Sequence, residues 1–134
     1  MIKRITHIGV AVKNLKEASE RFRNLLGVRS PVEESVASEK VKVAMFELGE
    51  TKIELTEATD PSSVIARFIE KRGEGVHHIS FEVENVEAEL ERLKGEGFEV
   101  LEGYPKVGAN GYRVAFLHPE LTCGVLIELS EKLH

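Results

Sequence analysis

The chain has 134 residues, of which 42% are hydrophobic and 31% charged, and its formal net charge at pH 7 is −5. This length suits one globular domain, no apolar run approaches the roughly 20 residues that cross a bilayer, and the negative charge speaks against nucleic acid as the main partner. The single cysteine, Cys123, excludes an internal disulfide. We interpret it as an ordinary buried thiol, and with the lack of a signal-peptide pattern it predicts a cytoplasmic protein.

The first half of the chain is predicted to begin with a strand and a helix. Residues 5–12 alternate apolar and polar side chains, which is typical of a half-buried strand. Apolar residues recur at helical spacing from Leu15 to Leu26. Residues 41–48 and 51–57 alternate again and predict an antiparallel hairpin around the turn Gly49-Glu50.

The second half repeats this order after a connecting helix. Residues 28–37 give no clear pattern, whereas Asp60-Pro61 predicts a helix start with Asp60 as the N-cap. The repeat then predicts strands at 77–83, 98–101, 113–117 and 124–130, and a helix from Val86 to about Lys94.

The two halves match residue by residue. His78 lies 71 positions after His7, and both histidines open an alternating strand. Glu128 lies 74 positions after Glu54, and each glutamate sits between two apolar residues in the closing strand of its half. Two such similar offsets indicate a tandem duplication.

These four residues are candidate metal ligands. Their apolar neighbours must face the helices, so His7, Glu54, His78 and Glu128 are expected on the opposite, concave face of the sheet. Two neutral imidazoles and two carboxylates suit a divalent transition metal such as Co, Mn, Ni or Zn, and they balance its charge. Each residue alone is more often simply solvated, and it is their matching placement in two copies that favours a metal site.

We therefore predict an α+β fold of two tandem βαβββ modules, which form a curved mixed sheet around a metal-binding cup. Residues 1–134 are expected to be a single domain made of module 1, about 3–73, and module 2, about 75–132. His77 points away from His78 and is expected to pack or cap. His118 and His134 are expected to have no role in the site.

This pattern resembles the vicinal oxygen chelate, or glyoxalase, superfamily and, within it, the methylmalonyl-CoA epimerase family. The resemblance covers essentially the whole chain. It rests on the repeated module and on the motifs Leu48-Gly49-Glu50-Thr51-Lys52-Ile53-Glu54-Leu55, Gly75-Val76-His77-His78-Ile79, Lys106-Val107-Gly108-Ala109, Phe116-Leu117-His118-Pro119 and Gly124-Val125-Leu126-Ile127-Glu128-Leu129.

The resemblance implies a metal-dependent enzyme that interconverts the 2R and 2S forms of methylmalonyl-CoA. It implies that the four candidate ligands bind the metal, often cobalt in this family, and that Glu128 also transfers a proton. Some members use a second glutamate where this sequence has Lys42, so Lys42, Glu47 or a water is expected to serve the other face of the substrate.

Coenzyme A phosphates require basic residues, and Lys106 and Arg113 flank a glycine-rich loop, so they are candidates for CoA binding. Exposed solubilising charge is the alternative for each. The resemblance also implies a homodimer.

Other functions within the superfamily remain open. A glyoxalase I-type lactoylglutathione lyase uses the same two-histidine, two-glutamate site on a glutathione-linked substrate. A non-catalytic binding protein of the same fold commonly lacks the ligand set, and an extradiol dioxygenase needs two histidines and one glutamate. We expect no nucleic-acid or membrane partner.

Overall fold

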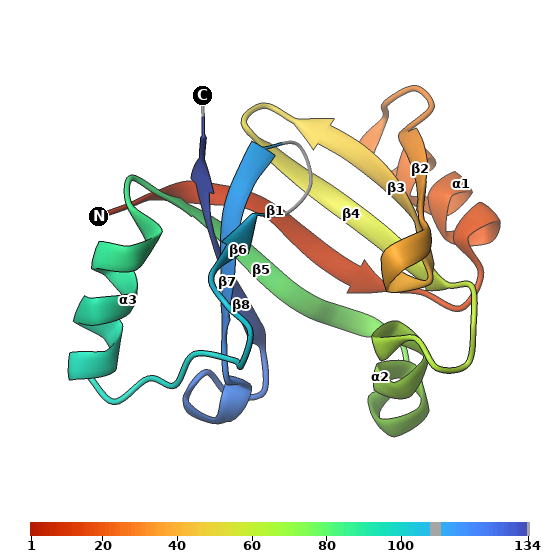
Figure 1. Cartoon of the computed structure of the whole chain (residues 1–134). Coiled ribbons are helices and arrows are strands. Elements are labelled where there is room, and N and C mark those ends of the chain that lie inside the picture. The colour runs from red at the N-terminus through yellow and green to blue at the C-terminus, as the bar shows by residue number, and fades with distance from the viewer. Residues whose placement is uncertain (108–110, 134) are drawn as a thin grey trace. The chain divides into compact units, whose positions relative to one another are not determined.

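A computed structural model describes residues 1–107 and 111–133. The expectations that concern Gly108, Ala109 and His134 lie outside these residues. The helices and strands, in chain order, are β1 (Ile2–Ala11), α1 (Leu15–Leu26), β2 (Val32–Val36), β3 (Val41–Leu48), β4 (Thr51–Ala58), α2 (Val64–Arg72), β5 (Gly75–Val83), α3 (Val86–Gly95), β6 (Lys106–Val107), β7 (Tyr112–Leu117) and β8 (Leu126–Lys132) (Figure 1).

The order of these elements repeats. A strand, a helix and three strands run from β1 to β4 and again from β5 to β8, with α2 between the two sets. The predicted α+β class, with its tandem βαβββ order and mixed strand pairing, is confirmed. Short 3₁₀ turns, η1 (Ala37–Glu39) and η3 (Pro119–Leu121), lie before β3 and between β7 and β8.

The described chain divides into two compact units. Unit two is His7–His77, and unit one combines Met1–Thr6 with the chain from His78 onward. The division runs through β1 and β5, so each of these strands contributes residues to both units.

In unit two the strands are hydrogen-bonded in the order β2-β3-β4-β1. β3 and β4 form the expected hairpin, and Gly49 at its turn has a φ of 65° that favours glycine. β1 runs parallel to β4, and the partner of Gly9 is Glu54.

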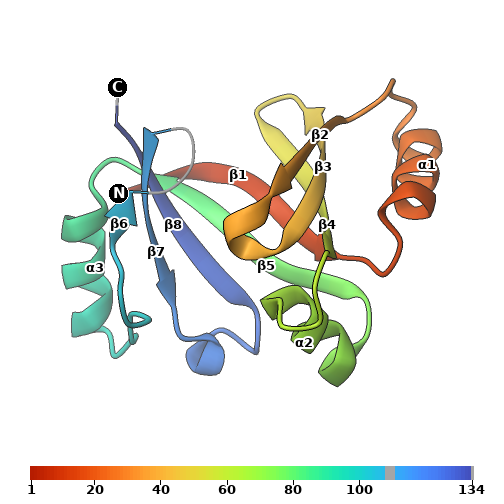
Figure 2. The ribbon, with the colours of Figure 1, turned by 45° about the vertical axis from the view of Figure 1, so that its right-hand side comes forward.

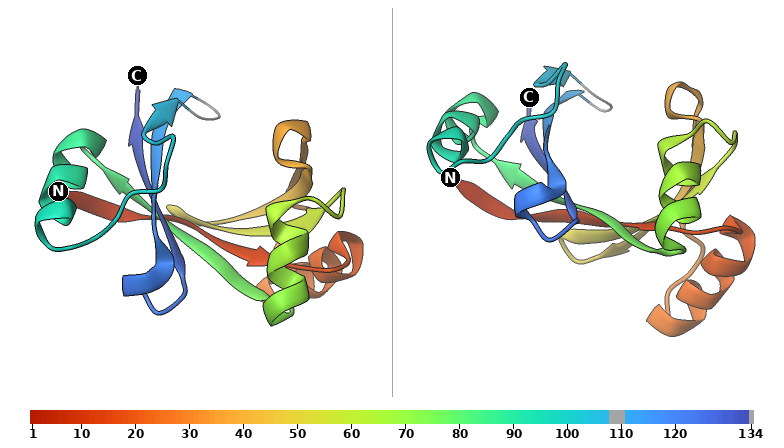
Figure 3. Two further views of the ribbon diagram at one scale, coloured as in Figure 1. Left: turned by 60° about the horizontal axis from the view of Figure 1, so that its bottom comes forward. Right: turned by 90° about the horizontal axis from the view of Figure 1, so that it is seen from below.

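Two helices cover opposite faces of the unit-two sheet. Leu15 of α1 packs with Ala44 and Phe46 of β3, whereas Ile65 of α2 packs with Val43. Successive residues of a strand point to opposite faces, so α2, which contacts Val43, and α1, which contacts Ala44, lie on different sides of the sheet. Figure 3 shows α1 and α2 on either side of β1.

In unit one the strands follow the order β5-β8-β7-β6, with the beginning of β1 beside β5. The backbone N–H of Glu84 donates to the Met1 carbonyl at 3.4 Å, and the Thr6 hydroxyl donates to the Ser80 carbonyl at 3.2 Å. β5 and β8 are parallel. α3 packs against this sheet (Figure 2), and the buried core consists of Val83, Val86, Leu90, Leu93, Ala115, Leu117 and Leu129.

The helix starts are built alike in the two units. The Asn14 side chain accepts a hydrogen bond from the Glu17 N–H, and the Asn85 side chain accepts one from the Ala88 N–H. Each asparagine therefore satisfies an N–H group that has no partner within the helix.

Two local expectations were wrong. α2 begins at Val64 with Ser63 as its N-cap, because Asp60 accepts hydrogen bonds from the backbone and hydroxyl of Ser62 and so closes a turn ahead of the helix. Residues 98–101 form one isolated bridge, between Val100 and Leu117, and the strand that pairs with β7 is β6.

Within residues 1–107 and 111–133, no helix has the length and apolar character needed to pass through a bilayer.

Candidate metal centre

Unit two brings His7 and Glu54 together. The parallel pairing of β1 with β4 sets Gly9 opposite Glu54, and His7 lies two residues before Gly9 on the same face of β1. The His7 Nε2 atom lies 4.0 Å from a Glu54 carboxylate oxygen, and both side chains are about one-fifth exposed. Two ligands at roughly 2.1 Å from one ion lie about 3–4 Å apart, so this pair has the spacing of metal ligands.

His7 is held neutral. Burial, followed by the positive charge of Lys52, lowers the pKa of His7 from 6.5 to about 4. A neutral imidazole keeps a nitrogen lone pair available at pH 7, which metal binding requires. The electrostatics of unit two therefore suit a histidine ligand.

Unit one holds the equivalent pair, His78 and Glu128. Ser80 of β5 is the partner of Glu128 on β8, and His78 lies two residues before Ser80 on the same face. Burial raises the pKa of Glu128, and the nearby Ser80 hydroxyl partly opposes this rise. A carboxylate with a raised pKa is a stronger proton acceptor than an exposed one.

Each unit thus carries one imidazole and one carboxylate at equivalent places of the repeat. Within unit two, His7 and Glu54 lie at a distance that one ion could bridge. Nitrogen and carboxylate oxygen donors of this kind suggest a divalent metal and do not select one ion among cobalt, manganese, nickel and zinc.

Comparison with known proteins decides the family. The model of the Glyoxalase/Bleomycin resistance protein/Dioxygenase superfamily matches residues 6–116. The chain is 41% identical over 133 residues to the ethylmalonyl-CoA/methylmalonyl-CoA epimerase of Cereibacter sphaeroides, which covers 98% of this chain and 99% of that protein. It is 36% identical to the human mitochondrial methylmalonyl-CoA epimerase, over 96% of this chain and 73% of that protein. The chain belongs to the methylmalonyl-CoA epimerase family.

A solved structure agrees with this assignment. A variant of the Streptomyces coelicolor methylmalonyl-CoA epimerase, in complex with 2-nitronate-propionyl-CoA, has a TM-score of 0.87 and 33% identity, and the match covers 100% of both chains. The expected family, fold and enzyme class, an epimerase, are confirmed.

Lys42, one of the residues expected to transfer a proton, points to the face of the sheet opposite to that of Glu54. Lys42 pairs with Glu57 in the β3–β4 ladder, whereas the partner of Glu54 is Met45. Glu54 and Glu57 are three residues apart on a strand and point to opposite faces. The Lys42 ammonium lies 3.5 Å from Glu57, whose carboxylate accepts a 2.6 Å hydrogen bond from the Leu15 N–H at the start of α1.

Glu47, the other side chain named for the second proton transfer, lies on the Glu54 face. Its partner in the ladder is Lys52, two residues before Glu54 on β4. Glu47 is exposed, so it is accessible to a substrate on that face.

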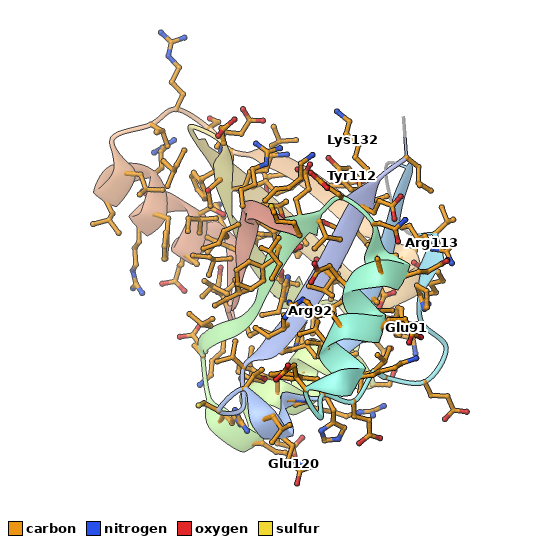
Figure 4. All side chains as sticks on the ribbon, turned by 90° about the vertical axis from the view of Figure 1, so that its left-hand side faces the viewer. Glu91, Arg92, Tyr112, Arg113, Glu120 and Lys132 are labelled. Atoms are coloured by element: carbon orange, nitrogen blue, oxygen red, sulfur yellow. The ribbon has the colours of Figure 1, made fainter. Side chains whose placement is uncertain are left out.

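Arg113, one of the two candidates for CoA binding, lies on the helix side of unit one. It is opposite Glu131 in the β7–β8 ladder and forms an ion pair with Glu87 of α3. Figure 4 shows Arg113 beside α3, away from Lys132 and Tyr112. The repeat explains this place, because Arg113 lies 71 positions after Lys42 and is its counterpart.

Lys106, the second candidate, lies on the Glu128 side of the sheet. It pairs with Val114, whose partner on β8 is Ser130, and Ser130 shares a face with Glu128. The Lys106 ammonium lies 4.8 Å from the centre of the Tyr104 ring. An exposed ammonium held by an aromatic ring can bind an anion without losing a carboxylate partner.

The surroundings of three further side chains, those of His77, Cys123 and Ser80, bear on the sequence-based expectations. His77 packs edge-on against Phe68 of α2, with ring centres 4.9 Å apart, as expected. Cys123 is exposed, so the expectation of a buried thiol was wrong. Ser80 is the ladder partner of Glu128, and the sequence offers no sign of its importance beyond its place two residues after His78.

Proposed function

We propose that this chain is a metal-dependent epimerase that interconverts (2R)- and (2S)-methylmalonyl-CoA through an enolate. The observation that carries the proposal is the repeated histidine–glutamate pair in a chain that aligns over nearly its whole length with methylmalonyl-CoA epimerases. The complex of the Streptomyces coelicolor relative with 2-nitronate-propionyl-CoA supports an acyl-CoA substrate.

In this proposal His7, Glu54, His78 and Glu128 hold one divalent cation, with Co²⁺ expected first and Mn²⁺, Ni²⁺ or Zn²⁺ as alternatives. The neutral state of His7 and the partial burial of the His7–Glu54 pair support this role. A bound dication would act as a Lewis acid and stabilise negative charge on the thioester oxygen.

The protein's own groups move the protons. Glu128 removes the proton from the carbon between the thioester and the carboxylate, and a second group returns a proton to the opposite face. Burial of Glu128 supports its role as the base. We assign the second transfer to Glu47 rather than Lys42, because Glu47 shares the Glu54 face and Lys42 does not.

Lys106 is proposed to bind a phosphate of coenzyme A. Its exposure and its place on the Glu128 side of the sheet support this role. Arg113 is the weaker candidate, because its guanidinium is already paired with Glu87. A homodimer remains a prediction from the resemblance, and a cytoplasmic location remains a prediction from the sequence. Sedimentation of the purified protein tests the oligomeric state.

The decisive experiment is proton–deuteron exchange at the alpha carbon of methylmalonyl-CoA in heavy water. Chelator-treated protein should exchange slowly, and added Co²⁺ should restore the rate. Glu128→Gln should abolish exchange, whereas Glu33→Gln, on the exposed strand β2, should not change it. The proposal is wrong if no exchange occurs with or without metal, and turnover of a glutathione-linked substrate instead would identify a glyoxalase I-type enzyme.

A further inference from the structure

Ser80 is a buried hydroxyl with no structural explanation. Ser80 is 1% exposed, and its Oγ atom has no hydrogen-bond partner among the described residues. An unpaired buried polar group destabilises the folded state, so proteins seldom keep one without a use for it.

The group that Ser80 faces is Glu128. The two residues are direct partners in the parallel β5–β8 ladder, and their side chains point to the same face of the sheet. Hydrogen bonds to catalytic groups are often long in a ligand-free protein and shorten when the substrate binds.

The repeat contains a natural comparison. Gly9 is the counterpart of Ser80, 71 positions earlier, and it is the partner of Glu54 in the β1–β4 ladder. Glycine has no side chain, so Glu54 receives no donor from this position. The two glutamates of the repeat therefore differ in their ladder partners. The partner of Glu128 carries a hydroxyl, and the partner of Glu54 carries no side chain.

We propose that Ser80 is a positioning residue, which donates a hydrogen bond to the Glu128 carboxylate and fixes its orientation toward the alpha carbon of the substrate. The inference rests on the proposed function. It explains why Glu128, and not the equivalent Glu54, transfers the proton. Because Ser80 acts on the base rather than on the substrate, its loss should lower kcat and leave KM nearly unchanged.

The test compares three variants of the metal-loaded chain. Ser80→Ala removes the hydroxyl, and Ser80→Cys keeps the shape with a weaker donor. The control is Ser130→Ala on the same sheet face, where the hydroxyl donates to the Phe81 carbonyl. Loss of a hydrogen bond to a charged group predicts a fall in kcat of roughly 10- to 100-fold for both Ser80 variants and no comparable fall for Ser130→Ala.

A second readout does not depend on activity. The ¹³C signal of the Glu128 carboxyl group, identified by its loss in Glu128→Gln, should shift in metal-free Ser80→Ala and stay in place in Ser130→Ala. The inference is overturned if the wild-type chain epimerises and Ser80→Cys keeps full kcat, or if the Glu128 signal does not move. An inactive wild-type chain in which the signal still shifts would instead refute the proposed function and leave the Ser80–Glu128 contact established.

Discussion

Side-chain direction favours Glu47 over Lys42 as the second acid–base group, because only Glu47 shares the Glu54 face. We expect Glu47→Gln to lower kcat by roughly 10²–10⁴-fold, the usual contribution of a positioned acid or base. Lys42→Met should lower stability by less than about 1 kcal/mol, because it removes an ion pair that is partly exposed, and should leave kcat unchanged. Steady-state epimerisation rates check both variants, and equal losses would show that Lys42 does reach the substrate.

Glu82 should make the protein sensitive to acid. Its carboxylate is buried and accepts hydrogen bonds from Arg4 Nε at 3.0 Å and Nη2 at 2.8 Å. The hydrogen bond from Arg4 lowers the pKa of Glu82 below its usual 4.5. A pKa that is lower in the folded state means that the stabilisation is present above pH 4.5 and is lost as the pH falls through the lowered value.

The corresponding variant is Glu82→Gln. At neutral pH it should cost roughly 1–2 kcal/mol, allowing for the exposed Arg4, and the difference from the wild-type chain should vanish at low pH. Urea unfolding at several pH values measures this. The exposed neighbour Glu84→Gln is the control, and a Glu82 effect that grows on acidification would contradict the assignment.

At the scale of residues, the sequence contains enough to predict most of the candidate site. The four metal-ligand candidates followed from alternation and from the repeat. The place of Lys42 could also have been found, because a hairpin turning at Gly49-Glu50 pairs residue 42 with residue 57 and not with 54. The position of the Ser80 hydroxyl beside Glu128 could not be predicted, because it depends on which strands become neighbours in the sheet.

At the scale of elements, each module fixes its first helix with a glutamate from its last strand. Glu57 accepts from the Leu15 N–H at 2.6 Å, and Glu131 accepts from the Val86 N–H at 2.9 Å. A carboxylate at a helix N-terminus pairs an N–H group and opposes the helix dipole.

We expect Glu57→Ala and Glu131→Ala each to lower the free energy of unfolding by about 1 kcal/mol. Chemical denaturation provides the measurement. Glu20→Ala, on the exposed part of α1, is the matched control and should have little effect. A large loss in one variant alone would show that the two helices do not depend on equivalent contacts.

Elements with strong periodicity were predicted well, and those that depend on neighbours were not. β1, α1, the β3–β4 hairpin, α3 and β8 follow from local patterns. β2 has no clear alternation and exists because it pairs with β3 along its whole length. The predicted strand at 98–101 is reduced to the bridge between Val100 and Leu117, with a hydrogen bond from the Leu101 N–H to the Phe116 carbonyl. Gly103, at a φ of 88°, and Pro105, which lacks an N–H, separate this bridge from β6.

At the scale of the whole molecule, the proposed metal should stabilise the folded chain against unfolding. An ion at 100 times its dissociation constant adds about 2.7 kcal/mol, so removal by a chelator should lower Tm by roughly 5–10 °C. His78→Ala should abolish this shift, whereas His118→Ala, on the loop after β7, should retain it. Differential scanning calorimetry makes the comparison, and equal shifts in the two variants would place the ion elsewhere.

The division into modules at about 3–73 and 75–132 remains a prediction, and the compact units follow a different division of the chain. Unit one includes Met1–Thr6. The Thr6 hydroxyl donates to the Ser80 carbonyl of β5, and the Met1 carbonyl accepts from the Glu84 N–H directly after β5. During synthesis these residues leave the ribosome well before the strand that receives them, whereas His7–His77 is continuous. A fragment that starts at Gly75 should therefore lack an edge strand, and an added peptide of residues 1–11 should bind there by strand complementation.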